Sequence, residues 1–185
     1  MRYVTVEQFM QRYAVDRDQA DRVGKLAAEF LKQLPKPEVE SRADNVALLQ
    51  WAANLHEIGL SISHNGYHKH SAYIAGNADM PGFSKNDQAR LAALLIGHTG
   101  KLGKLANNHG FNDWRMLFCL RLAHVLCRGR NDANLPKIKV SEHEGSYLVS
   151  LSKDWVTEHP LTEFSLTKEA AEWERIGRPY EVSLK

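Results

Sequence analysis

The sequence predicts a mainly α-helical bundle followed by a small α+β segment. Two observations predict this. Apolar residues recur at spacings of three and four as far as about residue 131, and from residue 138 they alternate with polar residues instead. The first pattern is typical of helices with one buried face, and the second is typical of strands. We therefore expect a helical domain over residues 1–131 and an α+β subdomain over residues 132–185.

The first two helices are predicted from their ends. Thr5 and Gln8 have the spacing of a capping box, so a short helix is expected to open there. Asp16 or Asp18 caps the second helix, whose apolar stripe runs until Pro35 and Pro37 stop it.

Three more helices follow in the first segment. One runs from about Arg42 to Ile58 and ends at Gly59, which is expected to be a left-handed cap. Ser84 caps the next, and Gly-rich residues 99–111 are expected to form a loop. The last begins at Asn112 and is amphipathic, with these basic residues on a solvated face: Arg115, Arg121, Arg128 and Arg130.

The second segment reads as a hairpin, a helix and a strand. Residues 138–151 alternate in polarity around Glu144-Gly145, which is the pattern of a β-hairpin with a tight turn. A helix is expected from His159-Pro160 to about Gly177, and residues 180–184 read as a last strand.

The composition excludes several classes of protein. The chain is 43% hydrophobic and 25% charged, without a membrane-length apolar run or a signal-like start, so a soluble cytoplasmic protein is expected. A formal net charge of +2 argues against a protein that coats nucleic acid. Cys119 and Cys127 fall in one predicted helix roughly 12 Å apart, too far for a disulfide, so we expect reduced, buried thiols.

Histidines gather in one stretch of the chain. His56, His64, His68 and His70 fall within fifteen residues, beside Lys69. Imidazole ligates metals and, once protonated, pairs with phosphate, so the stretch predicts a metal site or an anion site. The alternative is a loop held by hydrogen bonds from histidine to the backbone. We expect His64, His68 and His70 on an exposed loop. Later in the chain, His98 and His124 are expected to be buried and hydrogen-bonded.

Residues 55–59, with His56-Glu57 in the last turn of a helix before that stretch, resemble the HD-type domain of the exopolyphosphatase and guanosine pentaphosphate phosphohydrolase family. Further stretches resemble the C-terminal half of that family in the same order: Thr5 to Asp16, Trp51 to Ser63, His68 to Tyr73, Asp79 to Ser84, Leu120 to Ala123 and Trp155 to Leu184. Within the family, His64, Gly66, His68 and His70 favour exopolyphosphatase.

The resemblance implies an HD-domain-like helical bundle and a catalytic site that lies in other domains. The family's hydrolytic chemistry belongs to N-terminal actin-like domains, and this sequence has none of their glycine-rich phosphate loops. The chain is therefore expected to be a C-terminal half without catalytic residues or a cofactor of its own, with Mg²⁺ expected for the missing half. The expected partners are inorganic polyphosphate, the missing domains and a second copy, but no membrane and no specific nucleic acid.

HD phosphohydrolases hold a metal with one histidine, a His-Asp pair and a later aspartate, and the metal activates water. At these positions the resemblance places Gln19, His56-Glu57 and His124. Only His56 is kept, so no metal is expected in this chain. If a metal is bound, the ligands would be His56, Glu57, His98 and His124.

Three functions remain open from the sequence. In the first, the chain holds polyphosphate, whose terminal phosphate the parent enzyme releases, through a line of cations: His64, His68, Lys69, His70, Lys101, Lys104, Arg128 and Arg130. Guanosine pentaphosphate (pppGpp) is the alternative substrate. In the second, the chain is a standalone metal-dependent HD phosphohydrolase. In the third it is a structural or dimerisation module, with these aromatic anchors: Phe9, Tyr13, Trp155 and Trp173.

Overall fold

The computed structural model describes residues 1–35, 42–132 and 134–185. For Arg42 and Ala43 it describes the backbone alone. Its elements are, in chain order, α1 (Arg2–Arg12), α2 (Arg17–Gln33), α3 (Arg42–Leu55), the 3₁₀ helix η1 (Ile58–Ser61), α4 (Tyr67–Asn77), α5 (Lys85–Gly97), α6 (Gly103–Ala106), α7 (Trp114–Leu126), β1 (Lys139–His143), β2 (Ser146–Leu151), α8 (Lys153–Thr157), α9 (Pro160–Arg175) and β3 (Tyr180–Leu184). This mainly helical order with a small C-terminal sheet confirms the predicted fold class.

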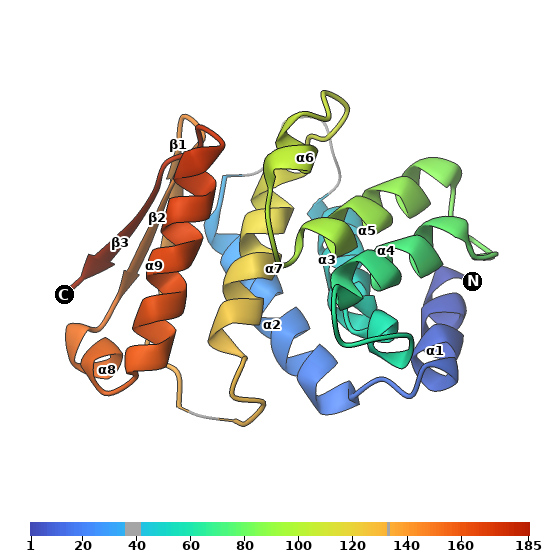
Figure 1. Cartoon of the computed structure of the whole chain (residues 1–185), viewed down its shortest axis with the longest axis horizontal. Coiled ribbons are helices and arrows are strands. Elements are labelled where there is room, and N and C mark those ends of the chain that lie inside the picture. Colours follow the sequence, from blue (N-terminus) through green and yellow to red (C-terminus); the bar gives the residue numbers. More distant parts are fainter. Residues whose placement is uncertain (36–41, 133) are drawn as a thin grey trace.

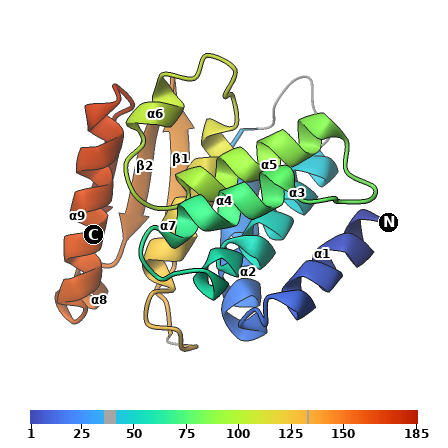
Figure 2. The same ribbon diagram turned by 45° about the vertical axis from the view of Figure 1, so that its right-hand side comes forward.

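Helix α7 lies in the middle of the molecule. In Figures 1 and 2, α9 and the sheet lie on one side of it, and α3, α4 and α5 lie on the other. Nine of its thirteen residues are buried, including Arg121, as expected for a helix with others on several sides. The predicted solvated arginine face is therefore wrong for Arg121. Among the described residues, no helix has the length and apolarity needed to cross a membrane.

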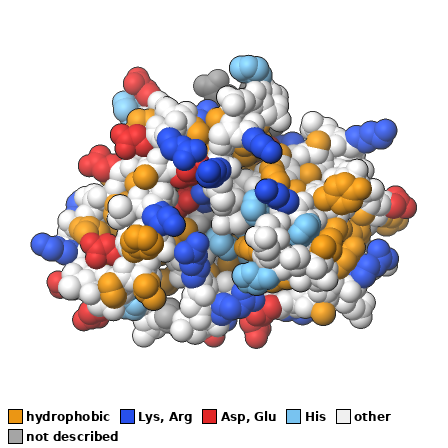
Figure 3. All heavy atoms as spheres, viewed as in Figure 1, with side chains coloured by type: hydrophobic (Ala, Val, Ile, Leu, Met, Phe, Trp, Pro, Cys, Tyr) orange, Lys and Arg blue, Asp and Glu red, His pale blue; other side chains and the backbone are white. Residues whose placement is uncertain are grey.

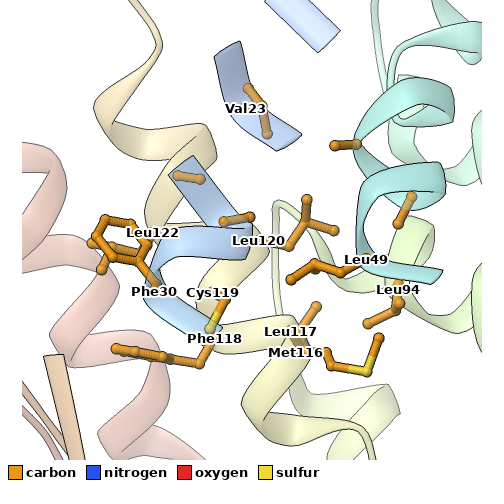
Figure 4. Close-up of a cluster of buried hydrophobic side chains, with 14 of the residues drawn as sticks. Val23, Phe30, Leu49, Leu94, Met116, Leu117, Phe118, Cys119, Leu120 and Leu122 are labelled. Carbon is orange, nitrogen blue, oxygen red and sulfur yellow. The ribbon is translucent and has the colours of Figure 1, made fainter. Parts of the chain in front are cut away.

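Three helices, α2, α3 and α5, supply side chains to the core around α7. Figure 4 shows Val23 and Phe30 of α2, Leu49 of α3 and Leu94 of α5 gathered beside Leu117 and its neighbours on α7. The side chains labelled in this view are each at most 3% exposed. Burying one such side chain stabilises the folded chain by about 1.5–3 kcal/mol. Cys119 and Cys127 are buried free thiols, as predicted.

The α+β part packs against the same core. Phe118 of α7 stacks on Tyr147 of β2 with ring centroids 4.2 Å apart, and Trp173 of α9 packs edge-on against both. Buried residues from both parts form one hydrophobic cluster. The predicted boundary at residues 131–132 stays a prediction.

Of the side-chain caps predicted at Thr5, at Asp16 or Asp18, and at Ser84, two are confirmed and one is wrong. The Asp16 side chain accepts a hydrogen bond from the Gln19 amide, and Ser84 accepts one from the Asp87 amide, so both predicted caps are confirmed. The predicted capping box at Thr5 is wrong, because α1 begins at Arg2. The Thr5 hydroxyl instead donates to the Pro81 carbonyl, 2.6 Å away, and so joins α1 to the turn before α5.

Gly59 allows η1 to pack against α4. It does not have the left-handed conformation predicted for it, and α3 ends before it, at Leu55. A Cβ at Gly59 would lie 2.1 Å from the Tyr67 carbonyl oxygen and 2.5 Å from the Ser71 amide nitrogen. The Ser71 hydroxyl accepts from the Gly59 amide and donates to the His56 carbonyl, both at 2.8 Å. Glycine is required here by close approach of two backbones.

Helix α4 occupies a stretch that was predicted to be a loop. It starts at Tyr67, directly after Gly66, whose φ is 65°. His68, Lys69 and His70 therefore lie on its first turn, and only His64 lies on the preceding loop. Histidine and glycine are poor helix formers, so the sequence did not predict a helix start at this place. The short helices α6 and α8 were also missed, and Pro37, expected to help end α2, lies outside the described residues.

The sheet has the strand order β1-β2-β3. The predicted hairpin is confirmed, because β1 and β2 pair antiparallel around Glu144 and Gly145, whose φ angles of 49° and 79° suit a two-residue turn. Strand β3 pairs parallel with β2 after the crossover through α9.

Gln33 joins the helical part to the outer strand. Its side-chain amide donates to the Ile138 carbonyl at 3.2 Å and accepts from the Val140 amide at 2.9 Å. One side chain at the end of α2 thus forms the pair of bonds that a neighbouring strand would form.

Candidate functional site

Three histidines from separate segments meet near the middle of the helical part. His56 follows α3, His98 follows α5, and His124 lies in the last turn of α7. Their ring centroids are 5.1 Å apart for His56 and His98, 5.7 Å for His56 and His124, and 5.1 Å for His98 and His124. We call these three rings the imidazole cluster.

The backbone fixes the tautomer of two of these rings. The His56 Nδ1 donates to the Ala53 carbonyl at 2.5 Å, and the His98 Nδ1 donates to the Leu95 carbonyl at 2.6 Å. Because a carbonyl only accepts, each neutral ring carries its proton on Nδ1 and has a lone pair at Nε2. The His56 Nε2 is buried and has no hydrogen-bond partner within the described part of the chain.

Tyr67, the first residue of α4, bonds to the other two rings. Its hydroxyl oxygen lies 3.0 Å from the His98 Nε2 and 3.1 Å from the His124 Nε2. Since the His98 Nε2 only accepts, the Tyr67 hydroxyl donates to it, and neutral His124 donates its Nε2–H to the phenol oxygen. This role of Tyr67 was not predicted from the sequence, because a tyrosine among histidines carries no spacing signal of its own.

Burial keeps the imidazole cluster uncharged near neutral pH. Loss of hydration lowers the pKa of His56, lowers the pKa of His98 well below its ordinary value, and lowers the pKa of His124 to about 3. The same cause raises the pKa of Tyr67 to about 12. The expectation of hydrogen-bonded histidines at 98 and 124 is confirmed, although His124 keeps part of its surface exposed.

The remaining positions of the HD metal pattern do not fit a metal cage. The Gln19 side chain donates to the Cys127 carbonyl at 2.9 Å and accepts from Arg22. The Glu57 carboxylate accepts two hydrogen bonds from Arg130, at 2.7 and 2.9 Å. Within the described residues, no group of three or more His, Cys, Asp or Glu side chains is arranged to hold a metal ion.

Several of the predicted anion-binding residues lie near Tyr67. The rings of His64 and His68 are each 6.3 Å from its ring. His68 also lies against Gly100, where an added Cβ would be 3.3 Å from its Nε2. The first turn of α4 therefore adjoins the loop that leads through Lys101 to Lys104 on α6.

These basic side chains reach the surface. His64, Lys69, Lys101 and Lys104 are exposed, and His68 and His70 are half-buried. Figure 3 shows lysine, arginine and histidine side chains gathered over the middle of one face, between the α9 side and the α4–α5 side. We use the name basic face for seven of the residues predicted to bind an anion: His64, His68, Lys69, His70, Lys101, Lys104 and Arg128.

The two arginines after α7 have different surroundings. Arg130 forms ion pairs with Asp16 at 3.0 Å and with Glu57 at 2.7 Å, so two carboxylates offset its charge. Arg128 is exposed and donates to the Ser165 hydroxyl at 3.2 Å, with no ion pair to any described residue. Of the two predicted residues, Arg128 has the charge available for an anion.

Buried Arg121 fixes the loop next to the basic face. It pairs with Glu169 of α9 and also donates to the carbonyl oxygens of Gly97 at 2.7 Å and Gly100 at 3.0 Å. The loop that carries Lys101 is therefore held from inside the protein.

The aromatic residues expected as interface anchors divide between core and surface. Phe9 and Trp173 are 5% and 0% exposed and serve the core. Trp155 is partly buried and stacks on His159 with ring centroids 4.0 Å apart, and Tyr13 packs partly buried against Phe9.

Comparison with known proteins gives a consistent assignment. Residues 1–170 match the family model described as Ppx/GppA phosphatase, domain III. A protein of Pseudoalteromonas translucida (strain TAC 125), named guanosine-5'-triphosphate,3'-diphosphate pyrophosphatase, is 33% identical over 177 residues, or 94% of this chain. Proteins with the same name are 33% identical over 96% of the chain in Vibrio atlanticus (strain LGP32) and 32% identical over 95% in Aeromonas hydrophila subsp. hydrophila. The chain spans 36% of the length of each of these relatives.

Proposed function

The chain belongs to the Ppx/GppA phosphatase family, through its domain III, and on this premise we propose that it is the substrate-holding, non-catalytic part of a phosphoanhydride hydrolase. The proposed substrate is inorganic polyphosphate, from which the parent enzyme would release terminal phosphate. The family prediction is confirmed. The preference for exopolyphosphatase within the family stays a prediction, because the relatives carry the guanosine name.

One observation carries the proposal: the contact of His68 with Gly100. This contact joins the start of α4, with Lys69, to the loop and helix that carry Lys101 and Lys104. The start of α4 has no side-chain cap and no acidic residue in its first turn, so its backbone amides add to the positive potential there. Cations at the positive end of a helix disfavour folding, but they favour a bound anion.

A phosphate polymer suits such a surface. It carries about one charge per phosphate, and a row of lysines releases its condensed counterions on binding. The buried Arg121 would hold the loop in place, while exposed Arg128 would extend the row toward α9. Chemistry would then belong to the part of the longer relatives that this chain does not span.

The second candidate substrate is pppGpp, which the printed name of the relatives favours. Its phosphate groups are few and are split between two positions of the sugar. It would therefore contact fewer members of the basic face than a long polymer, and its affinity would depend less on salt.

The test is a titration of this chain with long polyphosphate, triphosphate and pppGpp at several salt concentrations. We expect affinity to rise with polymer length and the triple variant Lys69→Ala/Lys101→Ala/Lys104→Ala to reduce the log–log salt slope by about 2. The matched control removes the same charge from exposed lysines on the sheet side: Lys137→Ala/Lys139→Ala/Lys153→Ala. Equal weakening by both variants would contradict a specific basic face, and tighter binding of pppGpp than of the polymer would favour the second candidate.

A further inference from the structure

We propose that the Tyr67 hydroxyl closes a three-imidazole cage to divalent transition-metal ions by bonding to two of its rings. The cage is the imidazole cluster of His56, His98 and His124. The inference does not depend on the anion that the basic face binds. It bears on the alternative function predicted from the HD pattern, a metal-dependent phosphohydrolase within this chain.

The ring centroids have the spacing found around a tetrahedral ion, although no group of three or more His, Cys, Asp or Glu side chains among the described residues is arranged to hold an ion as it stands. In a tetrahedral site each imidazole nitrogen lies about 2 Å from the ion, and ring centroids are then roughly 5 Å apart. The rings here are 5.1, 5.7 and 5.1 Å apart. Three neutral imidazoles are also a donor set that suits zinc, cobalt and nickel.

The Tyr67 oxygen bonds to two of the three rings. It lies 3.0 Å from one Nε2 and 3.1 Å from another, which is about 1 Å longer than a bond from zinc to imidazole nitrogen. It occupies the lone pair of His98 and receives the proton of His124. Two of the three donors are therefore committed to hydrogen bonds.

The third nitrogen of the imidazole cluster is the His56 Nε2. The His56 Nε2 has a lone pair, is buried, and has no hydrogen-bond partner among the residues that the structure describes. A buried polar atom of this kind calls for a specific explanation. Tyr67 bonds to the Nε2 atoms of His98 and His124, and the His56 Nε2 is the nitrogen of the cluster that it does not reach.

The charged side chains beside the imidazole cluster also disfavour a bound metal ion. The Glu57 carboxylate, the acidic member of the predicted ligand set, is paired with Arg130. The cage therefore keeps its three nitrogens, but two of them are bonded to Tyr67 and the Glu57 carboxylate is held by Arg130.

Imidazole tautomers test the network in the unmodified protein. Long-range ¹H–¹⁵N NMR correlations should show the Nδ1–H form for His56 and His98 and the Nε2–H form for His124. The Nδ1–H form of His124 would overturn the proposed hydrogen bonds around Tyr67. This measurement needs no variant and therefore stands even where substitutions disturb folding.

Cobalt binding tests whether Tyr67 keeps metal ions out of the imidazole cluster. The unmodified chain should bind no stoichiometric Co²⁺, whereas Tyr67→Ala should bind one Co²⁺ per chain at least about tenfold more tightly, with the strong visible absorption of tetrahedral cobalt. The matched control, Tyr67→Ala/His98→Ala, should lose this gain. Stoichiometric binding of Co²⁺ by the unmodified cluster, or a folded Tyr67→Ala variant that binds none, would overturn the proposal.

Discussion

The guanidinium of Arg121 on α7 and the carboxylate of Glu169 on α9 form a buried ion pair 2.5 Å long, with 4% and 9% of their side chains exposed. Glu169 also accepts from the Trp173 indole at 3.1 Å, and Arg121 donates to the carbonyls of Gly97 and Gly100. Four segments of the chain thus meet at one pair of charges.

Loss of one partner of this pair should strongly destabilise the protein. Arg121→Met leaves the Glu169 carboxylate buried and unpaired, so we expect the free energy of unfolding to fall by about 3–5 kcal/mol in urea denaturation. The double variant Arg121→Met/Glu169→Met should lose much less. As a control, Arg17→Met breaks an exposed pair with Glu7, which water and salt already screen, and should change the free energy of unfolding far less. Equal losses from the buried and exposed variants would contradict this view.

A methyl group at Gly59 should separate η1 from α4. Gly59→Ala places a Cβ 2.1 Å from the Tyr67 carbonyl oxygen, so backbone must move, and we expect a loss of more than about 3 kcal/mol in thermal or urea unfolding. Gly103→Ala is the matched control, because an added Cβ there meets nothing within 4 Å. It should change the free energy of unfolding by no more than about 1 kcal/mol. Similar losses at both glycines would rule out the close contact as the cause.

Stability should fall in mild acid because of the imidazole cluster. Folding lowers the pKa of its histidines below the ordinary 6.5, to about 3 for His124. As the pH falls below 6.5, the unfolded chain takes up protons that the folded chain does not, so acid favours unfolding. The free energy of unfolding should drop by up to about 1.4 kcal/mol per pH unit for each such histidine.

Urea unfolding between pH 7 and about 5 would measure this loss, in a range where most carboxylates stay ionised. His124→Gln should flatten the dependence on pH. His143→Ala, at an exposed position on β1, should leave it unchanged. An unchanged slope in His124→Gln would exclude His124 from the effect.

Arg128 and Arg130 should differ as anion contacts. Arg128→Ala should lower polyphosphate affinity and reduce the salt slope by about 0.7–0.9, since an exposed cation is removed. Arg130→Ala should leave the slope nearly unchanged and act on stability, because Asp16 and Glu57 lose their shared partner. Salt-dependent titrations of both variants, each checked by thermal unfolding, decide between the two roles. A larger slope change for Arg130→Ala would contradict this assignment.

Local signals in the sequence were sufficient for much of the fold. Asp16 and Ser84 have side chains that cap the helix they precede, and Glu144-Gly145 suits the turn that joins β1 to β2. Each of these features depends on residues within a few positions of one another. Thr5 has the same local pattern, but its hydroxyl bonds to Pro81, far along the chain, and the prediction there was wrong.

The candidate site depended on contacts that the sequence does not display. The positions of His98 and His124 were anticipated from their apolar neighbours, but the hydroxyl that joins them comes from Tyr67 on a helix that the sequence concealed. Arg121 has the spacing of a surface residue, and only its distant partner Glu169 explains its burial. Pairs of polar residues far apart in sequence carry no periodic signal.

The Gln33 amide has a further consequence for the sheet. It reaches the Ile138 carbonyl and the Val140 amide at the same time, and in a pleated strand such outward groups recur only at every second residue. If β1 slid by one position against β2, the amide would face groups that point the other way, and Val140 would leave the core. Gln33 therefore favours a single register of the hairpin, because only that register presents both groups to its side chain.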